Sequence, residues 1–222
     1  MGLKDATFLV TSACDGVGLA CAHRLAAGGA GVVICGVDDE ALQHAEGELH
    51  QYGVPVYAQV ADIARSREVE TALGETMRVF GGLDGVVVIT AAPQQQPLLE
   101  TDDEAFDRAL AGGVRAAYVV CQRTARLMVG RGRGGSLVLV GPAAAGPGEP
   151  GPAAAVAREA LAGLARELAV ELRPHGIRVN AVVQGPEPQR NEAVASLVAF
   201  LMDTEAAPPS GAVIDLGAAG PA

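Results

Sequence analysis

One short segment near the start of the chain has residue types suited to holding a ligand. Residues 11–18 read TSACDGVG, and they lie between an apolar run and the start of a helical pattern. Glycine lets a backbone turn approach a pyrophosphate, and it lets the following helix pack closely on its strand. Gly16 and Gly18 are suited to both roles. The segment therefore predicts a phosphate-binding turn.

The other groups that could act as acids, bases or metal ligands are scattered. Asp62 follows a later apolar run, where it either faces a ligand or serves as a turn residue at the end of a strand. The four cysteines lie in apolar segments without a Cys-x-x-Cys pair, and His23 completes no metal-site spacing. We expect no metal site and four reduced core thiols: Cys14, Cys21, Cys35 and Cys121.

Short β-branched runs alternate with longer amphipathic segments, and these elements must position the turn. We expect strands at residues 7–10, 32–35, 56–59, 85–89, 137–140, 178–182 and 212–215. Their nearly continuous apolar sequences, such as VVVI and LVLV, require burial on both faces. The alternation predicts an α/β fold in a single domain over residues 1–222. Its core is a doubly wound, Rossmann-type parallel sheet of about seven strands with helices on both faces.

Two predicted helices, over residues 104–130 and 153–172, have especially regular apolar spacing. The repeating residues include Phe106, Leu110, Val114, Leu161, Leu164 and Leu168. The arginines between residues 123 and 133 fit the end of the first helix, where cations meet the negative end of the helix dipole.

Charge and hydropathy exclude several classes of partner. The formal net charge of −10 argues against nucleic acid, which requires a clustered positive surface. No apolar run approaches the roughly 18 residues that span a bilayer, and the first residues do not form a secretion signal. We expect a soluble cytoplasmic protein that contacts neither membrane nor nucleic acid.

Landmarks along essentially the whole chain resemble the short-chain dehydrogenase/reductase family. The segment TSACDGVG is similar to the family's Thr-Gly-x-x-x-Gly-x-Gly turn, with Ser12 at the first glycine. The segments VADIA, GGLDGVVVITAA, GGSLVLVG, HGIRVNAVVQGP and SGAVIDLG follow in the family's order. The resemblance implies a Rossmann-type fold that binds NAD(P) at Ser12, Gly16, Gly18 and Asp62.

Several features of the implied cofactor site depart from the family pattern. If Ser12 is left-handed, the conformation costs about 1–2 kcal/mol relative to glycine. The NADP-selecting arginine would fall at Val37 and the NAD-selecting aspartate at Gly36, so neither is present. Asp38 and Asp39 either face a ribose or begin a helix. Residues 89–92 read ITAA in place of Asn-Asn-Ala-Gly. We therefore expect no cofactor, or only very weak binding of NAD(P).

The four positions that perform hydride transfer in the family are also changed. The asparagine aligns with Gly113, the serine with Gly141, the tyrosine with Ala154 and the lysine with Arg158. Arginine stays protonated and cannot replace a phenol as proton donor. We therefore expect a degenerate family member without catalytic residues.

The remaining polar residues do not restore the chemistry. Tyr118, His175, Ser136 and Thr90 are the nearest candidates by sequence, and each is better explained as a packed or surface residue. The substrate lid, around residues 186–198, is shorter than in relatives. A short lid leaves an open cleft, which does not exclude the water that hydride chemistry must avoid.

The first functional hypothesis is a non-catalytic subunit. It would assemble with an active member of the family, or with itself, through the helices around residues 104–130 and 153–172. The alternative is an NAD(P)-dependent oxidoreductase with atypical catalytic residues, and a second alternative is a ligand-binding module.

Overall fold

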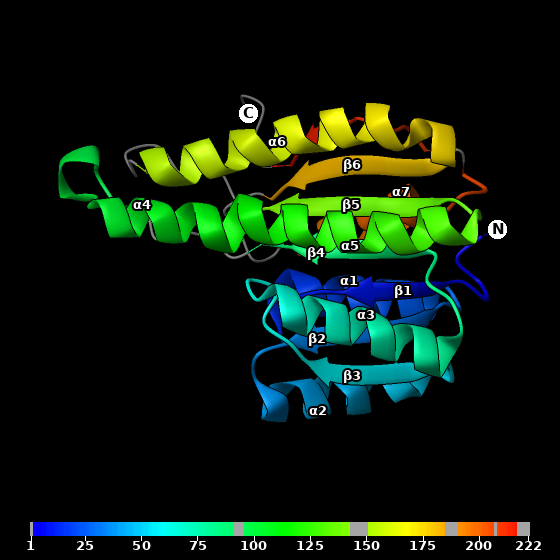
Figure 1. The fold of residues 1–222 in the computed structure, drawn as a ribbon. Coiled ribbons are helices and arrows are strands. Elements are labelled where there is room, and N and C mark those ends of the chain that lie inside the picture. Colours follow the sequence, from blue (N-terminus) through cyan, green and yellow to red (C-terminus); the bar gives the residue numbers. More distant parts are fainter. Residues whose placement is uncertain (1, 91–95, 143–150, 185–190, 207, 217–222) are drawn as a thin grey trace, which may run out of the picture.

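The computed structural model describes residues 2–90, 96–142, 151–184, 191–206 and 208–216. Seven parallel strands form one sheet in the order β3-β2-β1-β4-β5-β6-β7 (Figure 1). The strands are β1 (Thr7–Val10), β2 (Gly31–Gly36), β3 (Val56–Val60), β4 (Gly85–Ile89), β5 (Gly135–Gly141), β6 (Ile177–Val183) and β7 (Val213–Asp215). The predicted fold class, a doubly wound parallel sheet, is confirmed.

Helices cover both faces of this sheet. The helices α1 (Gly16–Ala27), α2 (Asp39–Leu49) and α7 (Asn191–Met202) lie on one face. The opposite face is covered by α3 (Ser66–Phe80), α5 (Ala116–Arg131) and α6 (Pro152–Leu172). Among the described residues, no helix has the length and hydropathy that a membrane crossing requires.

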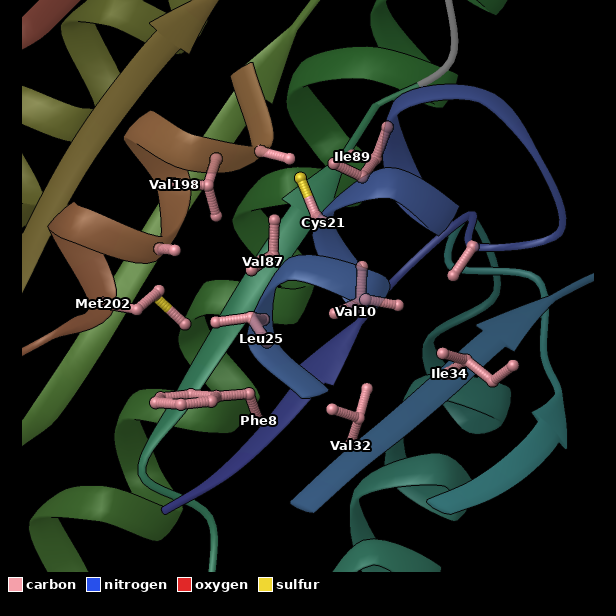
Figure 2. Packing of buried hydrophobic residues seen from close by; sticks show 14 of the residues in the cluster. Phe8, Val10, Cys21, Leu25, Val32, Ile34, Val87, Ile89, Val198 and Met202 are labelled. Atoms are coloured by element: carbon pink, nitrogen blue, oxygen red, sulfur yellow. The ribbon is translucent and has the colours of Figure 1, made fainter. Parts of the chain in front are cut away.

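Consecutive strand residues are divided between two hydrophobic cores. Phe8 and Val10 pack toward α1, whereas Leu9 between them packs toward α3 and α5. Figure 2 shows the first core, where Phe8, Leu25 and Met202 meet from a strand and two helices. Successive side chains of a strand point to opposite faces, so burial on both faces requires the uninterrupted apolar runs of the sequence.

The strand β2 extends one residue beyond the predicted apolar run at each end, because Gly31 and Gly36 also pair with the neighbouring strands. A Cβ on Gly31 would lie 2.9 Å from Cε1 of Phe80, and a Cβ on Gly36 would lie 2.3 Å from Sγ of Cys14. Side chains therefore fill the space beside these strand ends. Glycine carries no apolar signal, so the sequence pattern stopped one residue short.

The first of the two long predicted helices is interrupted by a wider turn. It consists of α4 (Asp103–Leu110), a π-helical turn (Ala111–Arg115) and α5. Such turns insert one extra residue, and they are frequent at functional sites. As predicted, the helix ends among the arginines, with left-handed Gly132 as its C-cap. The second helix, α6, is continuous.

The apolar face of α6 is directed toward the sheet. Leu161 is only 2% exposed and packs into the sheet-facing core, and Leu164 and Leu168 pack at its margin. The outward-facing apolar residues are instead Val156 and Val170, which is 72% exposed. The leucines at helical spacing therefore belong to the sheet-facing side of α6, which the spacing alone did not show, because a helical period defines a stripe without saying which neighbour covers it.

Candidate functional site

The turn after β1 is tied to the neighbouring strand β4. Thr11 is buried, and its Oγ1 accepts a hydrogen bond from the backbone N–H of Ile89 at 2.8 Å. The Ser12 hydroxyl donates to the Ile89 carbonyl at 3.3 Å. These bonds fix the start of the turn at the point where the strand order reverses, between β1 and β4.

The turn itself contains two left-handed residues. Ser12 has φ +49° and Gly16 has φ +53°. Glycine adopts this region freely, but at Ser12 it costs about 1–2 kcal/mol. A Cβ on Gly16 would meet no other atom within 4 Å, so the backbone at this residue borders open space. The first backbone N–H groups of α1 begin here, and they lack partners within the helix.

Gly18 allows α1 to pack against the turn. A Cβ at this position would lie 2.2 Å from the Ser12 carbonyl oxygen and 3.0 Å from the Cα of Ala13. Both neighbours are backbone atoms, so no side-chain rotation could relieve the contact. The residue type at position 18 is therefore set by the close packing of helix on turn.

A cavity of about 430 Å³ lies beside this turn, at the carboxyl ends of β1, β2 and β3. Its lining residues come from three successive strand-to-helix connections and from the π-helical turn. They are Ser12, Cys14, Asp15, Gly36, Val37, Asp38, Ala41, Ala61, Asp62, Ile63, Ala64 and Gly112. Of the four predicted cofactor residues, Ser12 and Asp62 line the cavity, whereas Gly16 and Gly18 shape the adjoining turn.

The charge of this cavity is negative. Among the described residues, Asp15, Asp38 and Asp62 line it, and no arginine or lysine does. The Asp38 carboxylate caps α2 by accepting the Ala41 N–H at 3.0 Å. Asp38 therefore begins a helix, which was one of its two expected roles, and it also lines the cavity. Asp62 similarly accepts the Ala64 N–H at 2.9 Å, as a turn residue would. Each carboxylate has a second oxygen, which leaves an acceptor for a ligand hydroxyl.

Two arginines border the cavity, but both are engaged. Arg65 lies 3.5 Å from Asp62 and 3.1 Å from Glu68. Arg115, from the π-helical turn, donates to the Ala64 carbonyl at 2.9 Å. This contact joins the π-helical turn to the β3–α3 connection. The sequence reasoning missed it, although the Gly-Gly pair at residues 112–113 was a signal for irregular backbone.

The four positions assigned to catalysis by the resemblance gather around the first half of α6. A Cβ on Gly113 would lie 3.6 Å from the Cβ of Ala157, and a Cβ on Gly141 would lie 3.4 Å from Cδ1 of Leu161. Ala154 is buried in the first turns of the same helix. Arg158 is partly buried, with its Nε 3.5 Å from the Glu159 carboxylate. It carries the one titratable side chain among the four positions.

The other candidates lie away from the cavity. Thr90 is buried and donates to the Val140 carbonyl at 3.3 Å. Ser136 lies at the amino end of β5, away from the carboxyl ends that border the cavity, and it donates to the Leu201 carbonyl. Tyr118 is 46% exposed on α5, so it is a surface residue. His175 lies exposed in the turn after α6. Residues 186–190 of the predicted lid lie outside the described residues, and its remaining residues, 191–198, begin α7.

Three of the four cysteines behave as core thiols. Burial raises the pKa of Cys21, Cys35 and Cys121 to about 12. Cys14 is the exception, because it is half-buried and lines the cavity. Among the residues that the structure describes, no three His, Cys, Asp or Glu side chains are grouped as metal ligands would be.

Comparisons with known proteins assign the chain to a family. Residues 12–194 match the family described as enoyl-(acyl carrier protein) reductase. The chain is 33% identical over 186 residues to human dehydrogenase/reductase SDR family member 4, covering 82% of this chain and 66% of the human protein. It is 34% identical over 185 residues to 2,5-dichloro-2,5-cyclohexadiene-1,4-diol dehydrogenase of Sphingobium indicum, covering 82% and 73%.

Solved structures show the same fold. A short-chain dehydrogenase from Mycobacterium smegmatis superposes with a TM-score of 0.89 at 26% identity, over 99% of this chain and 94% of its own. A short-chain type dehydrogenase/reductase from Mycobacterium marinum gives 0.90 at 24% identity, over 96% and 94%.

These comparisons overturn the first functional hypothesis. Relatives that are a third identical to the chain are named as dehydrogenases and reductases, which contradicts a non-catalytic subunit and favours the oxidoreductase alternative. The expectation of no cofactor loses its support for the same reason. None of the comparisons shows that the catalytic residues are lost. That loss, at Gly113, Gly141, Ala154 and Arg158, stays a prediction. The matched residues and the shared fold lead to one conclusion: the chain belongs to the short-chain dehydrogenase/reductase family.

Proposed function

We propose that the protein is an NAD(P)-dependent oxidoreductase that interconverts a carbonyl compound and an alcohol. The observation that carries this proposal is the cavity beside the turn after β1. It lies at the carboxyl ends of parallel strands, next to the reversal of strand order between β1 and β4. This is the position at which open α/β sheets bind dinucleotides.

The residues present fit one half of such a cofactor. The left-handed Gly16 and the free N–H groups of α1 offer donors to a pyrophosphate. Asp38 and Asp62 line the part of the cavity that would hold the adenosine, and their carboxylates can accept hydrogen bonds from ribose hydroxyls. When bound, the cofactor supplies or accepts the hydride.

The charge of the cavity favours NAD(H) over NADP(H). Three carboxylates and no cation line it among the residues that the structure describes, so a 2′-phosphate would meet repulsion without a compensating partner there. A ribose 2′-hydroxyl would instead find an acceptor in Asp38. We therefore expect NAD(H) to be the working cofactor.

Arg158 is the candidate for stabilising charge at the reacting carbonyl. Its guanidinium stays protonated, and it can donate hydrogen bonds to the oxygen on which negative charge develops. It releases no proton at neutral pH, so solvent water supplies the proton that completes reduction. Replacing Arg158 with Gln is expected to lower kcat about a hundredfold while leaving NADH affinity unchanged, since loss of one such donor typically costs about 10²–10³.

Calorimetric titration with NAD+, NADH, NADP+ and NADPH tests the cofactor half of the proposal. We expect saturable binding of the NAD pair and several-fold weaker binding of the NADP pair, with the difference reduced by D38N. Turnover across ketones and alcohols, followed by nicotinamide absorbance, tests the reaction. Absence of both cofactor binding and turnover would refute the proposed function.

We also propose that two copies assemble through α4, α5 and α6. The segment from α4 to α5 is acidic at its start, with Asp103 and Asp107, and basic toward its end, with Arg126 in α5 and Arg133 just after its C-cap. An antiparallel pair around a twofold axis near Tyr118 brings each acidic end to the partner's basic end. Exposed Phe106 and Val129, at either side of Tyr118, would then pack together.

Light scattering tests this assembly. We expect a dimer for the wild-type chain and a monomer for V129E, which places a carboxylate in the interface. The matched control is V79E, which changes a similarly exposed valine on α3, outside this surface. A wild-type monomer, or equal effects of the two variants, would contradict the proposed surface.

A further inference from the structure

A second cavity lies at the opposite edge of the sheet from the proposed cofactor site. Its volume is about 450 Å³, and it is lined by Arg166, Ala169, Val170, Arg173, Gly176, Ile177, Arg178, Ser210 and Gly211. Figure 1 shows the C-terminal end of α6 at this edge, beside the start of β6 and away from the arrowheads. Nothing in the oxidoreductase chemistry proposed above uses these residues.

Two arginines of this cavity lack carboxylate partners among the described residues. Arg166, in α6, and Arg173, directly after the last residue of α6, are both exposed, with Val170 between them. The positions three and four residues to either side of Arg166, and three and four residues before Arg173, are occupied by Gly, Ala or Val, so no carboxylate stands at the usual helical spacing of an ion pair. Five other arginines do have a carboxylate within 3.5 Å: Arg65, Arg78, Arg108, Arg123 and Arg158. What sets Arg166 and Arg173 apart from the other arginines without a carboxylate partner among the described residues is that both line one cavity.

The floor of the cavity adds a third cation and a hydroxyl. Arg178 is partly buried and donates to the carbonyls of Leu201 and Met202 at 2.6 and 3.5 Å, capping the end of α7. Burial lowers the pKa of Arg178, and the charge of Asp203 opposes this shift. Ser210 Oγ accepts the Val179 N–H at 3.2 Å, which leaves its own proton available to a ligand.

We propose that this cavity binds a small phosphomonoester through Arg166, Arg173 and Ser210. The planar donor forks of two arginines match the oxygens of a phosphate dianion, and the serine hydroxyl offers a further donor. Val170, which is 72% exposed between the arginines, provides an apolar contact for the organic part of the ligand. The site is independent of the cofactor site, because the two share no lining residue.

Calorimetric titration with phenyl phosphate and with inorganic phosphate, at constant ionic strength, tests the site. We expect saturable binding of both, with phenyl phosphate the tighter. The variant R166Q/R173Q is expected to weaken both roughly tenfold or more, because two charge-assisted contacts are lost. V170S is expected to remove only the advantage of phenyl phosphate.

The control is R24Q/R67Q, which removes the same two charges from exposed positions on α1 and α3. It should leave the affinities nearly unchanged. Equal weakening by both double variants would show attraction to net charge alone, or binding at the cofactor cavity, and would overturn the proposal. So would absence of saturable binding by the wild-type chain. If R166Q/R173Q changes the oligomeric state in light scattering, the cavity is an interface between copies and the proposal is wrong.

Discussion

Replacing Gly18 with alanine probes the close packing on which the cofactor turn depends. The added Cβ would lie 2.2 Å from the Ser12 carbonyl oxygen and 2.9 Å from its carbonyl carbon. These are backbone atoms of the turn that lines the cavity, so α1 and the turn must move apart. Overpacking of this kind typically lowers the stability of a protein by about 1–3 kcal/mol. Because backbone atoms cannot rotate away, we expect the contact made by Gly18→Ala to cost about 3 kcal/mol.

Part of this cost is offset by the helix itself. Alanine is more favourable than glycine in a helix by about 0.5–1 kcal/mol. The net destabilisation is then about 2 kcal/mol, which lowers the Tm of a domain of this size by about 4–8 °C. NAD(H) affinity should fall as well, because the displaced turn is the one that approaches the pyrophosphate.

The matched control is Gly47→Ala. Gly47 lies within α2, and a Cβ there would meet no other atom within 4 Å. It should raise the Tm by about 1–4 °C and leave cofactor affinity unchanged, because only the helix preference changes. Both variants are compared by thermal unfolding and calorimetric titration. A Gly18→Ala protein as stable as the wild type would refute the argument from packing.

Two further predictions concern the core. Thr124→Val should stabilise the protein by about 1–2 kcal/mol, since the Thr124 hydroxyl is buried without a hydrogen-bond partner among the described residues. Thr76→Val should instead destabilise it by about 0.5–1.5 kcal/mol, because that buried hydroxyl donates to the Ala72 carbonyl at 2.7 Å. Urea denaturation measures both, and changes of the same sign would refute this reasoning. The three buried thiols have a pKa raised from 9.0 to about 12, so they stay protonated in the folded state while those of the unfolded chain ionise above pH 9. Their contribution is therefore complete below pH 9 and is lost between pH 9 and 12, by roughly 1 kcal/mol for each thiol at pH 10. Replacing all three buried cysteines with alanine should reduce the loss of unfolding free energy between pH 8 and pH 10. An unchanged loss would contradict this role of the thiols. Alkylation at pH 8 should label Cys14 alone in the folded protein, so labelling of a buried thiol at the same rate would show that the core opens.

The sequence was sufficient for the sheet and for the turn after β1. Strands buried on both faces require continuous apolar runs, so the runs at residues 85–89 and 137–140 marked β4 and β5 directly. The turn could be predicted because its geometry restricts two residue types. Left-handed backbone favours glycine at Gly16, and close helix packing requires it at Gly18. These constraints act between neighbours in the chain, and a local pattern therefore records them.

The tertiary structure decided which surfaces those elements present. The sequence showed that Leu161 and Val170 lie on a helix, but only packing on the sheet buried the first and exposed the second. The cavity combines Ser12, Asp38 and Asp62, which are separated by more than twenty residues at each step and meet because parallel strands end at one edge. Local patterns carry no record of contacts between distant segments, so the negative charge of this cavity, like the arginines of the second one, emerged only when the chain was folded.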